Sequence, residues 1–599
     1  MATSSNIKNG GIATFVVKVG GNAIPDSLQV LSIRIEKRIN KISLARIVVL
    51  DGEANTGKFD VSSSSTFAPG GEVAIEAGYD AKNKVVFKGI ITQQSIRIDN
   101  FNGSVLEIEC RDAAIKMVIG RRNTTFSKKK DSEIISSIIS SYSGLSSDIT
   151  ATTTTWPEQV QYYVTDWDFI LTRAEINGLI VTTLNGKVSV NKPDADTSPA
   201  FTIAYGDGLL GFNADMNCLT QLGNVKANTW DYKNQALLSG QAANDHPGPG
   251  NLSSKKLSEV VGLANFQLQT TAPLESADLT DWSKAQLIKS EYAKIIGDAK
   301  FQGTELADPA KYLTLEGLGD RFNGDHLISG VVHNLSEGNW TTEVSLGLSP
   351  NWFIEEPDVM APPASGLLPG ARGLFNGTVK KMFEDPDSQY RILVTVPLFD
   401  QSGEGIWARL SNFYSTSGAG VFFLPEVGDE VILGFINEDP RYPVILGSLY
   451  SSTKLKPFTG LDPIEKNSLK AIVSKSGISV QFDDENKVYT VTTPAKNTMI
   501  ISDKDKKITI QDEHSNSIVM SADGITIKSP KDISIEADQS LKLTGKQGIK
   551  ISSSGGDVEV SGINIKESAQ SQYSAEGSMM AKINSGTELT LKSAMIMIN

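Results

Sequence analysis

The sequence predicts a mainly β protein whose C-terminal part is a prism built from three copies of the chain. Two observations support this prediction. Residues 12 to about 120 alternate apolar and polar residues over many short segments, which is typical of half-buried strands in a small barrel or sandwich. Residues 525–552 repeat a pair of apolar residues, two positions apart, every eight residues, with mostly polar residues between the pairs.

The eight-residue repeat predicts short strands with one apolar face. Residues at i and i+2 point to the same side of a strand, whereas a helix needs apolar spacings of three and four. One chain alone would leave a long apolar stripe in water, so the stripe must close on itself or on other copies of the chain. The predicted core residues of this needle are Ile525, Ile527, Ile533, Ile535, Leu541, Leu543, Ile549 and Ile551.

Three repeat architectures compete for this segment. The calcium-binding nonapeptide roll needs a Gly-Gly-x-Gly-x-Asp pattern that is absent, and the hexapeptide β-helix needs a period of six. A trimeric β-prism, or triple-stranded β-helix, fits a period of eight with few apolar residues. A stack of ordinary β-hairpins remains as an alternative. The spacing of the apolar pairs breaks over 568–580, where we expect an irregular layer.

Three helices are predicted among the N-terminal strands. The first covers 130–145, the second begins with Asp166 as its N-cap, and the third runs from 276 to Gly297 or Gly303. Residues 233–277 are rich in Gly, Pro, Asn and Ser, so we expect a loop or an insertion there.

Composition excludes several classes of protein. The net charge of −13 over 599 residues argues against a general nucleic-acid binder, and two cysteines cannot form a disulfide framework. Cys110 and Cys218 are expected to be buried free thiols. The N-terminus lacks the pattern of a secretory signal, and no segment has the ~18 apolar residues of a membrane helix. We therefore expect synthesis in the cytoplasm and, if the protein leaves the cell, export without a classical signal peptide.

The sequence predicts no catalytic, cofactor-binding or metal site. "GDGLLG", at 206–211, has the spacing of a dinucleotide-binding loop but no helix pattern follows it, so a turn is expected. The four histidines show no metal-ligand spacing. His514 alone lies in the repeats, where three chains could bring three copies of it to one axis, although a surface histidine is favoured.

Three motifs in the central part of the chain suggest a known family. "EDPDSQYRILVTV", "PEVGDEV" and "DPRYPVILGSLY" follow one another between 384 and 450. Together with the C-terminal repeats they resemble VgrG, the spike protein of type VI secretion, and the related hub-and-spike proteins of contractile phage tails and extracellular injection systems. The resemblance implies a hub of two barrels with helices over 1–360, a linker over 361–370, an OB-fold over 371–451 and a trimeric needle over 465–599.

The same resemblance implies a function and a set of partners. It implies a non-enzymatic, membrane-puncturing homotrimer that binds an Hcp-like inner tube protein, baseplate components, a PAAR-like tip protein and effector cargo, and is released as part of the injection particle. It implies no cofactor and no nucleic acid. The expected tip-docking residues are Met595, Ile596, Met597, Ile598 and Asn599. The alternatives are a phage-type tailspike enzyme or adhesin acting on a surface polysaccharide, or the same spike in a phage tail or a free extracellular particle.

Overall fold

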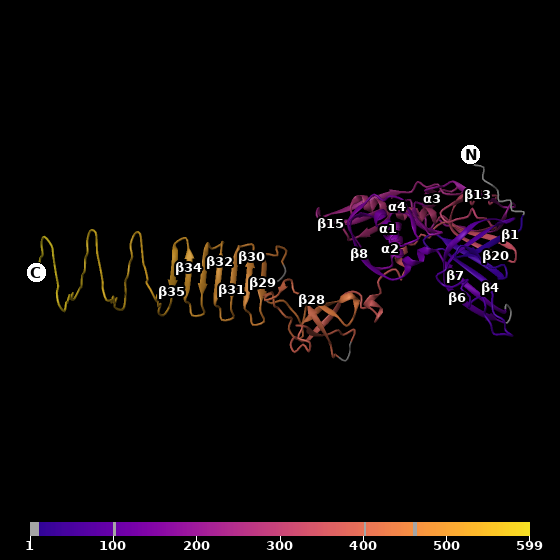
Figure 1. Ribbon diagram of the computed structural model, residues 1–599. Helices are drawn as coiled ribbons and strands as arrows, with labels where there is room; N and C mark the ends of the chain where they lie inside the picture. The colour runs from indigo at the N-terminus through magenta and orange to yellow at the C-terminus, as the bar shows by residue number, and fades with distance from the viewer. Residues whose placement is uncertain (1–10, 100–102, 357, 400–402, 459–463, 599) are drawn as a thin grey trace. The chain divides into compact units, whose positions relative to one another are not determined.

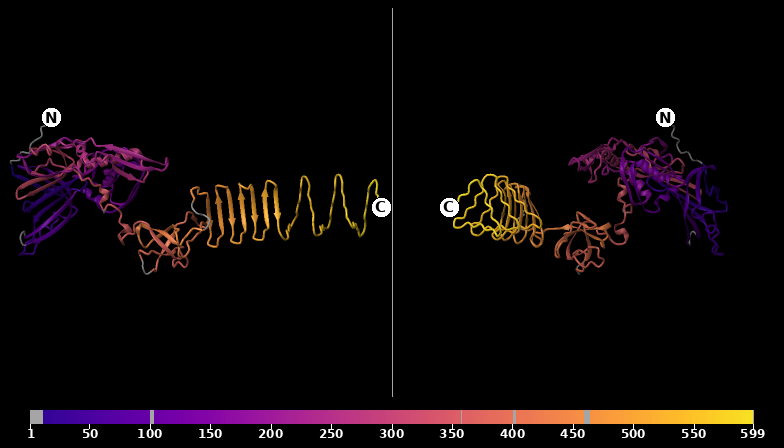
Figure 2. Two further views of the ribbon diagram at one scale, coloured as in Figure 1. Left: turned by 180° about the vertical axis from the view of Figure 1, so that it is seen from behind. Right: turned by 60° about the vertical axis from the view of Figure 1, so that its left-hand side comes forward.

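The computed structural model describes residues 11–99, 103–356, 358–399, 403–458 and 464–598. The chain forms two compact units, 1–449 and 450–599. The first contains the hub and the OB barrel, and the second contains the repeats (Figures 1 and 2). Among the described residues, no helix is long and apolar enough to cross a membrane.

The hub is organised by one large sheet. Its strands are β1 (Ala13–Val19), β2 (Asn22–Ala23), β3 (Val30–Arg38), β4 (Leu44–Leu50), β5 (Glu72–Tyr79), β6 (Lys82–Asp99), β7 (Gly103–Arg111), β13 (Pro199–Ala204), β14 (Leu209–Met216), β18 (Ile295–Gln302), β19 (Tyr312–Glu316), β20 (Gly324–Ser336) and β21 (Asn339–Leu346). Eleven follow the order β14-β18-β21-β20-β3-β4-β7-β6-β5-β1-β2, and β13 pairs β19, which pairs β20. Sequence-distant strands β3 and β20 join its two halves.

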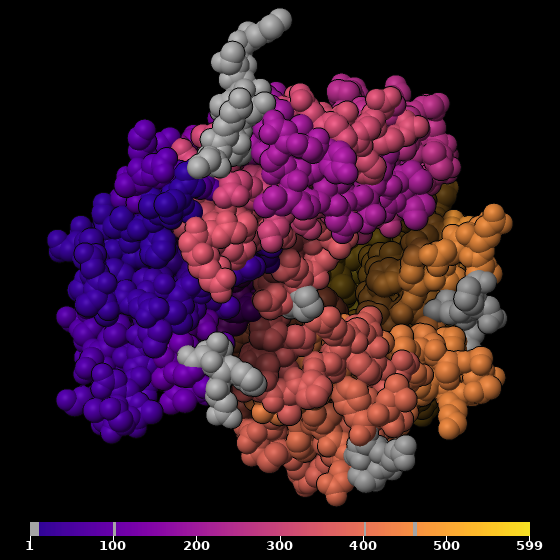
Figure 3. All heavy atoms as spheres, turned by 90° about the vertical axis from the view of Figure 1, so that its right-hand side faces the viewer, coloured from indigo at the N-terminus to yellow at the C-terminus, as the bar shows by residue number. Residues whose placement is uncertain are grey.

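Two hydrophobic cores lie along this sheet. The described hub strands form an open sheet, so the two hub barrels stay a prediction. The strands alternate as the sequence predicts: in β4, Ala45 and Ile47 are buried while Arg46 between them is exposed. The first core surrounds Trp340 and the second surrounds Phe201 and Phe301. The first half of the sheet, strands β1 to β7, is coloured indigo to violet in the space-filling view of Figure 3, where its residues form one body.

The helices and three small sheets complete the hub. The helices are α1 (Asp131–Ser140), α2 (Asp166–Ile176), α3 (Ser254–Val261) and α4 (Ser276–Tyr292). The small sheets contain β8 (Arg122–Lys130) with β10 (Thr155–Val164), then β9 (Ser146–Ile149), β11 (Ile180–Leu184) and β12 (Lys187–Asn191), and finally β15 (Asn224–Asp231), β16 (Ala236–Ala243) and β17 (Phe266–Thr270).

All three predicted helices differ from the structure at a boundary. The first, predicted over 130–145, is α1 and ends at Ser140. The N-cap of α2 is Thr165, whose hydroxyl accepts from the Asp168 amide, so Asp166 is the first helical residue and not the cap. The third predicted helix ends at Tyr292, because the following residues form β18 between β14 and β21. Strand pairing in the large sheet overrides the helical pattern there.

The prediction of a loop over 233–277 is wrong. The segment contains β16, α3 and β17, and both strands pair with β15. Its Pro- and Gly-rich centre is held by Lys294, a buried residue whose ammonium donates to the carbonyl oxygens of Pro247, Pro249 and Leu252 at 2.9, 2.6 and 2.9 Å. Burial lowers the pKa of Lys294 to about 8. Three carbonyl acceptors satisfy its three donors, so the segment is an ordered part of the hub.

The predicted OB-fold is a closed five-stranded barrel. Its strands are β22 (Phe375–Lys381), β23 (Ile392–Thr395), β24 (Ile406–Leu410), β27 (Glu430–Phe435) and β28 (Pro443–Ser448). A short hairpin, β25 (Ser415–Thr416) with β26 (Ala419–Gly420), lies outside the barrel path. Inward-facing residues such as Val394, Val431 and Ile445 fill its core.

The second unit has two segments. The first, called the meander sheet here, has β29 (Leu469–Val473), β30 (Ser479–Asp483), β31 (Val488–Thr492), β32 (Thr498–Ser502), β33 (Lys507–Gln511), β34 (Ser517–Ser521) and β35 (Gly524–Lys528), paired antiparallel in chain order. The second, the octad segment (529–598), contains no strand and continues as wide turns (Figures 1 and 2).

Candidate functional site

The meander sheet has one apolar face made of two rows of side chains. Strand register aligns one residue from each strand along each row. The first row is Ile472, Val480, Val491, Met499, Ile510, Ile518 and Ile527. The second row is Lys470, Phe482, Tyr489, Ile501, Ile508, Met520 and Ile525. Residues two apart on a strand share a face, so both rows lie on the same side of the sheet.

The predicted needle core continues these rows and is uncovered. Ile525 and Ile527 end the two rows in β35, and the other six predicted core residues follow in the octad segment. All eight side chains are exposed, with exposed fractions between 53% and 71%. Burying one such side chain contributes about 1.5–3 kcal/mol of stability, so covering all eight would stabilise the segment strongly.

The spacing of eight residues does not extend over the whole of 465–599, the range predicted for the needle. From β29 to β34, successive strands start ten or nine residues apart, and the predicted hairpin alternative describes this part. The reason is the turn: up to β34, each connection has four or five residues and a left-handed position, as at Lys496 (φ 67°) and Lys506 (φ 52°), whereas two residues connect β34 to β35. The eight-residue spacing belongs to the octad segment.

The predicted irregular layer at 568–580 keeps a regular backbone. Bends lie at 530–531, 538–539, 546–547, 554–556, 563, 570–571, 578–579, 586–587 and 594. The spacing of about eight therefore passes through 568–580, where Tyr573 stands at the position of the apolar pairs. Its hydroxyl donates to Glu567 at 2.7 Å. The irregularity is in the side chains and not in the path of the backbone.

The predicted tip residues are also uncovered. Met595, Ile596, Met597 and Ile598 have exposed fractions of 75, 51, 78 and 88%. Asn599 lies outside the described residues. Consecutive exposed residues on an extended chain point to alternate sides, so both sides of this end are apolar.

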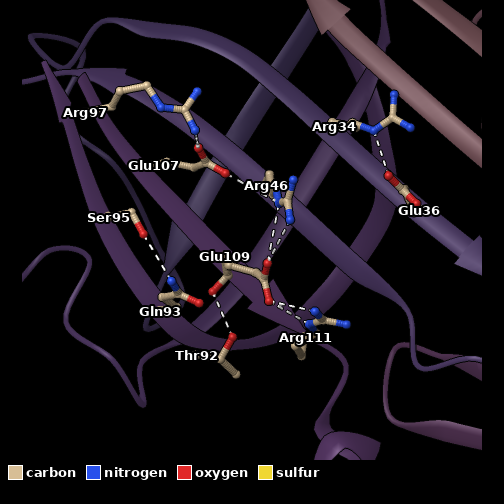
Figure 4. A network of polar contacts seen from close by, with 10 residues as sticks. All are labelled: Arg34, Glu36, Arg46, Thr92, Gln93, Ser95, Arg97, Glu107, Glu109 and Arg111. Carbon is tan, nitrogen blue, oxygen red and sulfur yellow. Dashed lines mark hydrogen bonds and ion pairs between the residues drawn. The ribbon is translucent and has the colours of Figure 1, made fainter. Parts of the chain in front are cut away.

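The hub presents a surface of the opposite kind, a charged face on the outer side of β3, β4, β7 and β6 (Figure 4). Arg46 and Arg111 approach Glu109 at 3.3 and 2.8 Å, and Arg97 approaches Glu107 at 3.3 Å. Partial burial raises the pKa of Glu109, but hydrogen bonds and charge from Arg111 and Arg46 outweigh it and lower the pKa overall. The charges pair with one another, which is typical of a solvated face.

The OB motifs found in the sequence are loop anchors. Asp385 accepts three backbone N–H bonds, from Asp387, Gln389 and Arg391, at 3.2, 2.8 and 3.1 Å, and it pairs with the Arg391 guanidinium at 2.6 Å. The hydrogen bonds from Arg391 hold the pKa of Asp385 well below its usual range. Asp439 and Arg441 repeat the arrangement, at 2.7 Å. These residues fix the loops of a small barrel and do not converge on a substrate-sized site.

The glycine motif at 206–211 and the histidines do not form a chemical site. Gly206 and Gly208 have φ of 87° and 88° in the connection between β13 and β14, so the first half of "GDGLLG" is the predicted turn and its last three residues begin β14. His333 is fully buried, and burial lowers its pKa well below the ordinary value. His514 is exposed beside Glu513. Within the described ranges, no group of three potential metal-ligating side chains is present.

The two cysteines differ from each other. Cys110 is buried, as expected, and burial raises the pKa of its thiol to about 12. Cys218 is only partly buried, so the expectation of a buried thiol is wrong for this residue. It lies just after β14, in the connection that leads to β15, where the sequence pattern for a buried strand has already ended.

The sequence analysis overlooked an apolar arm on the OB barrel. The arm, residues 411–425, contains the β25–β26 hairpin and four aromatic residues that are exposed, Phe413, Tyr414, Phe422 and Phe423. The signal was present in the sequence, because these fifteen residues include no Asp, Glu, Lys or Arg in a chain that is 21% charged.

Comparison with known protein families places the chain. The family described as Alg8 N-terminal domain matches residues 9–337, which is more than half of the chain. The chain belongs to this family. The family described as type VI secretion system/phage-baseplate injector OB domain matches 375–450, the closed barrel with its arm.

Individual relatives match over short segments. The chain is 24% identical to the type VI secretion system spike protein VgrG1a of Pseudomonas aeruginosa over 128 residues, 21% of this chain and 19% of that protein. It is 40% identical to the actin cross-linking toxin VgrG1 of Vibrio cholerae over 53 residues, 9% of this chain and 5% of that protein. The matches thus span a fifth or less of these relatives.

Solved structures show low overall similarity. A 43 kDa tail protein of prophage MuSo2 from Shewanella oneidensis has a TM-score of 0.43 at 10% identity, covering 56% of this chain and 98% of that protein. An Escherichia coli component of the type VI secretion system has a TM-score of 0.37 at 12% identity, covering 72% and 99%.

Proposed function

We propose that the protein is the homotrimeric, membrane-puncturing spike of a contractile injection apparatus. The observation that carries the proposal is the octad segment, in which seventy described residues form no strand within their own chain and expose an apolar pair about every eight residues. Backbone N–H and C=O groups and apolar stripes both need partners. Two further copies of the same segment, in the same register, supply both.

The meander sheet supports the same assembly. It has one face with two apolar rows, and a single sheet cannot bury such a face by itself. Three sheets whose apolar faces meet on one axis form a prism with a dry interior, and the octad segment then extends the prism as three interwound chains. A closed prism leaves no free strand edges along its length, which favours a stiff needle.

The remaining partners follow from the proposed machine. The hub would bind an Hcp-like inner tube protein and baseplate components, and the apolar end at Met595–Ile598 would bind a PAAR-like tip protein, with effector cargo carried by the assembly. The spike would be assembled in the cytoplasm and released with the injection particle. Type VI secretion, a phage tail and a free extracellular particle all fit these features.

We infer a structural role without catalysis. Among the described residues, no three side chains that could ligate a metal come together, and the match to the actin cross-linking toxin covers 5% of that protein. The tailspike enzyme or adhesin would need aromatic and acidic residues along the repeats, and after Tyr489 the repeats contain a single aromatic residue, Tyr573. No observation favours that alternative.

The solution mass of the full-length protein tests the proposal. The chain is 64.4 kDa, so a trimer weighs 3 × 64.4 = 193 kDa. A stable monomer at micromolar concentration would refute the spike. Deletion of residues 595–599 should leave the trimer intact and abolish binding of a PAAR-like protein. Unchanged binding would show that these residues are not the docking site.

A further inference from the structure

The octad segment has one charged residue among the positions of its apolar side. Bends at 570–571, 578–579 and 586–587 are eight residues apart, so the backbone is regular there. Counting back in steps of eight from the apolar pair Leu589 and Leu591 gives Ala581 and Ile583, then Tyr573 and Ala575, then Ile565 and Glu567. The earlier pairs, from 525/527 to 558/560, contain only Ile, Leu and Val. Residues two apart on an extended chain share a side, so Glu567 lies on the side of Ile565.

Glu567 and Tyr573 contact each other across a bend of the segment. The Tyr573 hydroxyl donates to Glu567 Oε2 at 2.7 Å, and this bond raises the pKa of Tyr573. The next positions on the same side are Ala575 and Ala581, whose small side chains leave room for the tyrosine ring. In one chain the pair is open to water, with Tyr573 66% exposed. The pair is thus a polar contact on the side that the other octads make apolar.

An apolar core with a period of eight does not fix how three chains are aligned. When one chain moves along the needle by eight residues, each apolar pair takes the place of another pair, so the buried apolar area hardly changes. Repetitive strands are prone to such slips of register. A polar group at a single core position removes this ambiguity, because a slipped chain places that group against apolar residues, as a buried Asn does in coiled coils.

We propose that Glu567 and Tyr573 of three copies of this chain form one buried polar layer, which holds the three octad segments in register. The inference rests on the proposed homotrimer, in which the same residue of each chain lies at the same height. In register, three carboxylates lie together with their three phenol donors. After a slip by eight residues, Glu567 of the displaced chain lies at the height of Ala575 or Val560 of its neighbours, where a carboxylate is strongly unfavourable.

Cysteine reporters in the full-length chain test the register. In the proposed prism each chain passes to the next face with each octad, so a residue lies beside the residue eight positions later in a neighbouring chain, about 4.8 Å away. Lys582 and Thr590 point outward at equivalent positions of successive octads. Lys582→Cys with Thr590→Cys should therefore give covalent trimers after oxidation with diamide, seen on a non-reducing denaturing gel.

Thr590→Cys alone reports a slip, because two copies of residue 590 become neighbours only when one chain moves by one octad. We expect no covalent dimers in the otherwise unmodified chain. We expect dimers when Glu567→Ile and Tyr573→Phe are added, since they make the layer apolar. Lys233→Cys, at an exposed residue of the hub, gives the level of disulfide formation between separate particles.

The outcomes separate this inference from the proposed function. A monomeric native mass overturns both. With a native mass of 193 kDa (3 × 64.4), three results overturn the layer and leave the trimer standing. These results are the absence of covalent trimers in the double cysteine variant, slip dimers in the chain that keeps Glu567 and Tyr573, and the absence of slip dimers in both backgrounds.

A second set of variants tests the burial of the layer without cysteines. Tyr573→Phe removes the donor to Glu567, which has little effect on a hydrated surface but leaves a buried carboxylate unsatisfied. We expect Tyr573→Phe to lower the fraction of trimer that survives detergent, and Glu567→Ile added to it to restore that fraction. Lys566→Ile, at the adjacent outward residue, is the matched control and should not restore it. The same effect of Tyr573→Phe with and without Glu567→Ile overturns the buried layer.

Discussion

The two segments of the second unit have related sequences and different ways of satisfying their backbone. In the meander sheet, strands from β29 to β34 start nine or ten residues apart, β35 starts seven residues after β34, and each strand finds its partner in the same chain. In the octad segment the spacing is about eight and strand pairing within the chain stops. The length of the repeat alone does not explain this change, because β34 and β35 pair antiparallel at a spacing of seven.

The difference also appears in the turns. Hairpins of the meander sheet place non-glycine residues in the left-handed region, at Lys487, Lys496, Lys506 and Ser515, with φ between 52° and 69°. Over the described part of the octad segment, no non-glycine residue has a positive φ. The bends of the octad segment therefore change the direction of the chain without returning it against the preceding strand.

Removing the octad segment should give the largest effect. A chain ending at Lys528 keeps the meander sheet but loses the residues that have no partner of their own. We expect the trimer to lose its resistance to detergent and heat, measured by denaturing gels of unheated samples and by light scattering. The melting transition of the hub serves as the control. A truncated trimer as resistant as the full-length protein would place the chain-to-chain interlock in the meander sheet.

A charge at one octad position comes next. Leu541→Asp would place three carboxylates inside the predicted dry core, whereas Lys542→Asp changes the adjacent residue that points outward. A large-to-small change at a core leucine alone costs about 2–5 kcal/mol, and an unpaired buried charge costs more. We expect loss of the trimer in the first variant and a near-normal trimer in the second, by analytical ultracentrifugation. Equal behaviour of the two variants would contradict the inward orientation of Leu541.

The turns of the meander sheet should respond to acid. The hydrogen bond from the Asn516 side chain lowers the pKa of Asp512, and the corresponding bond from Asn486 lowers that of Asp483. A carboxyl whose pKa is lower in the folded state stabilises the fold above its unfolded value, about 3.9, and this contribution is lost as the pH falls through the folded value. The protection factors of β33 and β34 amides, which are exchange rates corrected for the pH dependence of an unstructured chain, should therefore fall below pH 4.

The matched variant identifies the responsible group. Asp512→Asn removes the titrating carboxyl and keeps most of the hydrogen bonds of the turn, so exchange in β33 and β34 should depend less on pH than in the unmodified protein. The octad segment of the same molecules provides the internal comparison. An unaltered pH profile in the variant would assign the acid sensitivity to another group.

A single turn residue should give the smallest effect. Lys506→Gly relieves a left-handed backbone that costs a non-glycine residue roughly 1–2 kcal/mol of folding stability. The greater freedom of glycine in the unfolded chain offsets about 0.5–1 kcal/mol of this gain. We expect slower hydrogen exchange in β32 and β33 and no change in the trimer. Lys506→Val should have the opposite sign. Faster exchange in the glycine variant would show that Lys506 makes a favourable contact that outweighs the strain.

The sequence by itself determined the elements whose signal is local. Alternation predicted the hub strands, and the resemblance carried by the OB motifs implied the barrel. The side chains of Asp385 and Asp439 in these motifs bond to residues a few positions away. Pairs of apolar residues two apart predicted the rows that end at Ile525 and Ile527. Each of these signals lies within a few residues, where propensity and spacing act directly.

Only the tertiary structure decided what depends on distant partners. The sequence could not show that 236–243 pairs with β15, or that Lys294 holds the Pro247–Leu252 segment. The residues that separate these partners along the chain have no regular pattern from which the contacts could be predicted. It could not place the point near Lys528 where pairing within the chain ends. Hydrogen-bond partners of a strand are chosen by the assembled sheet, so the same apolar spacing serves a hairpin in one segment and leaves unpaired backbone in the next.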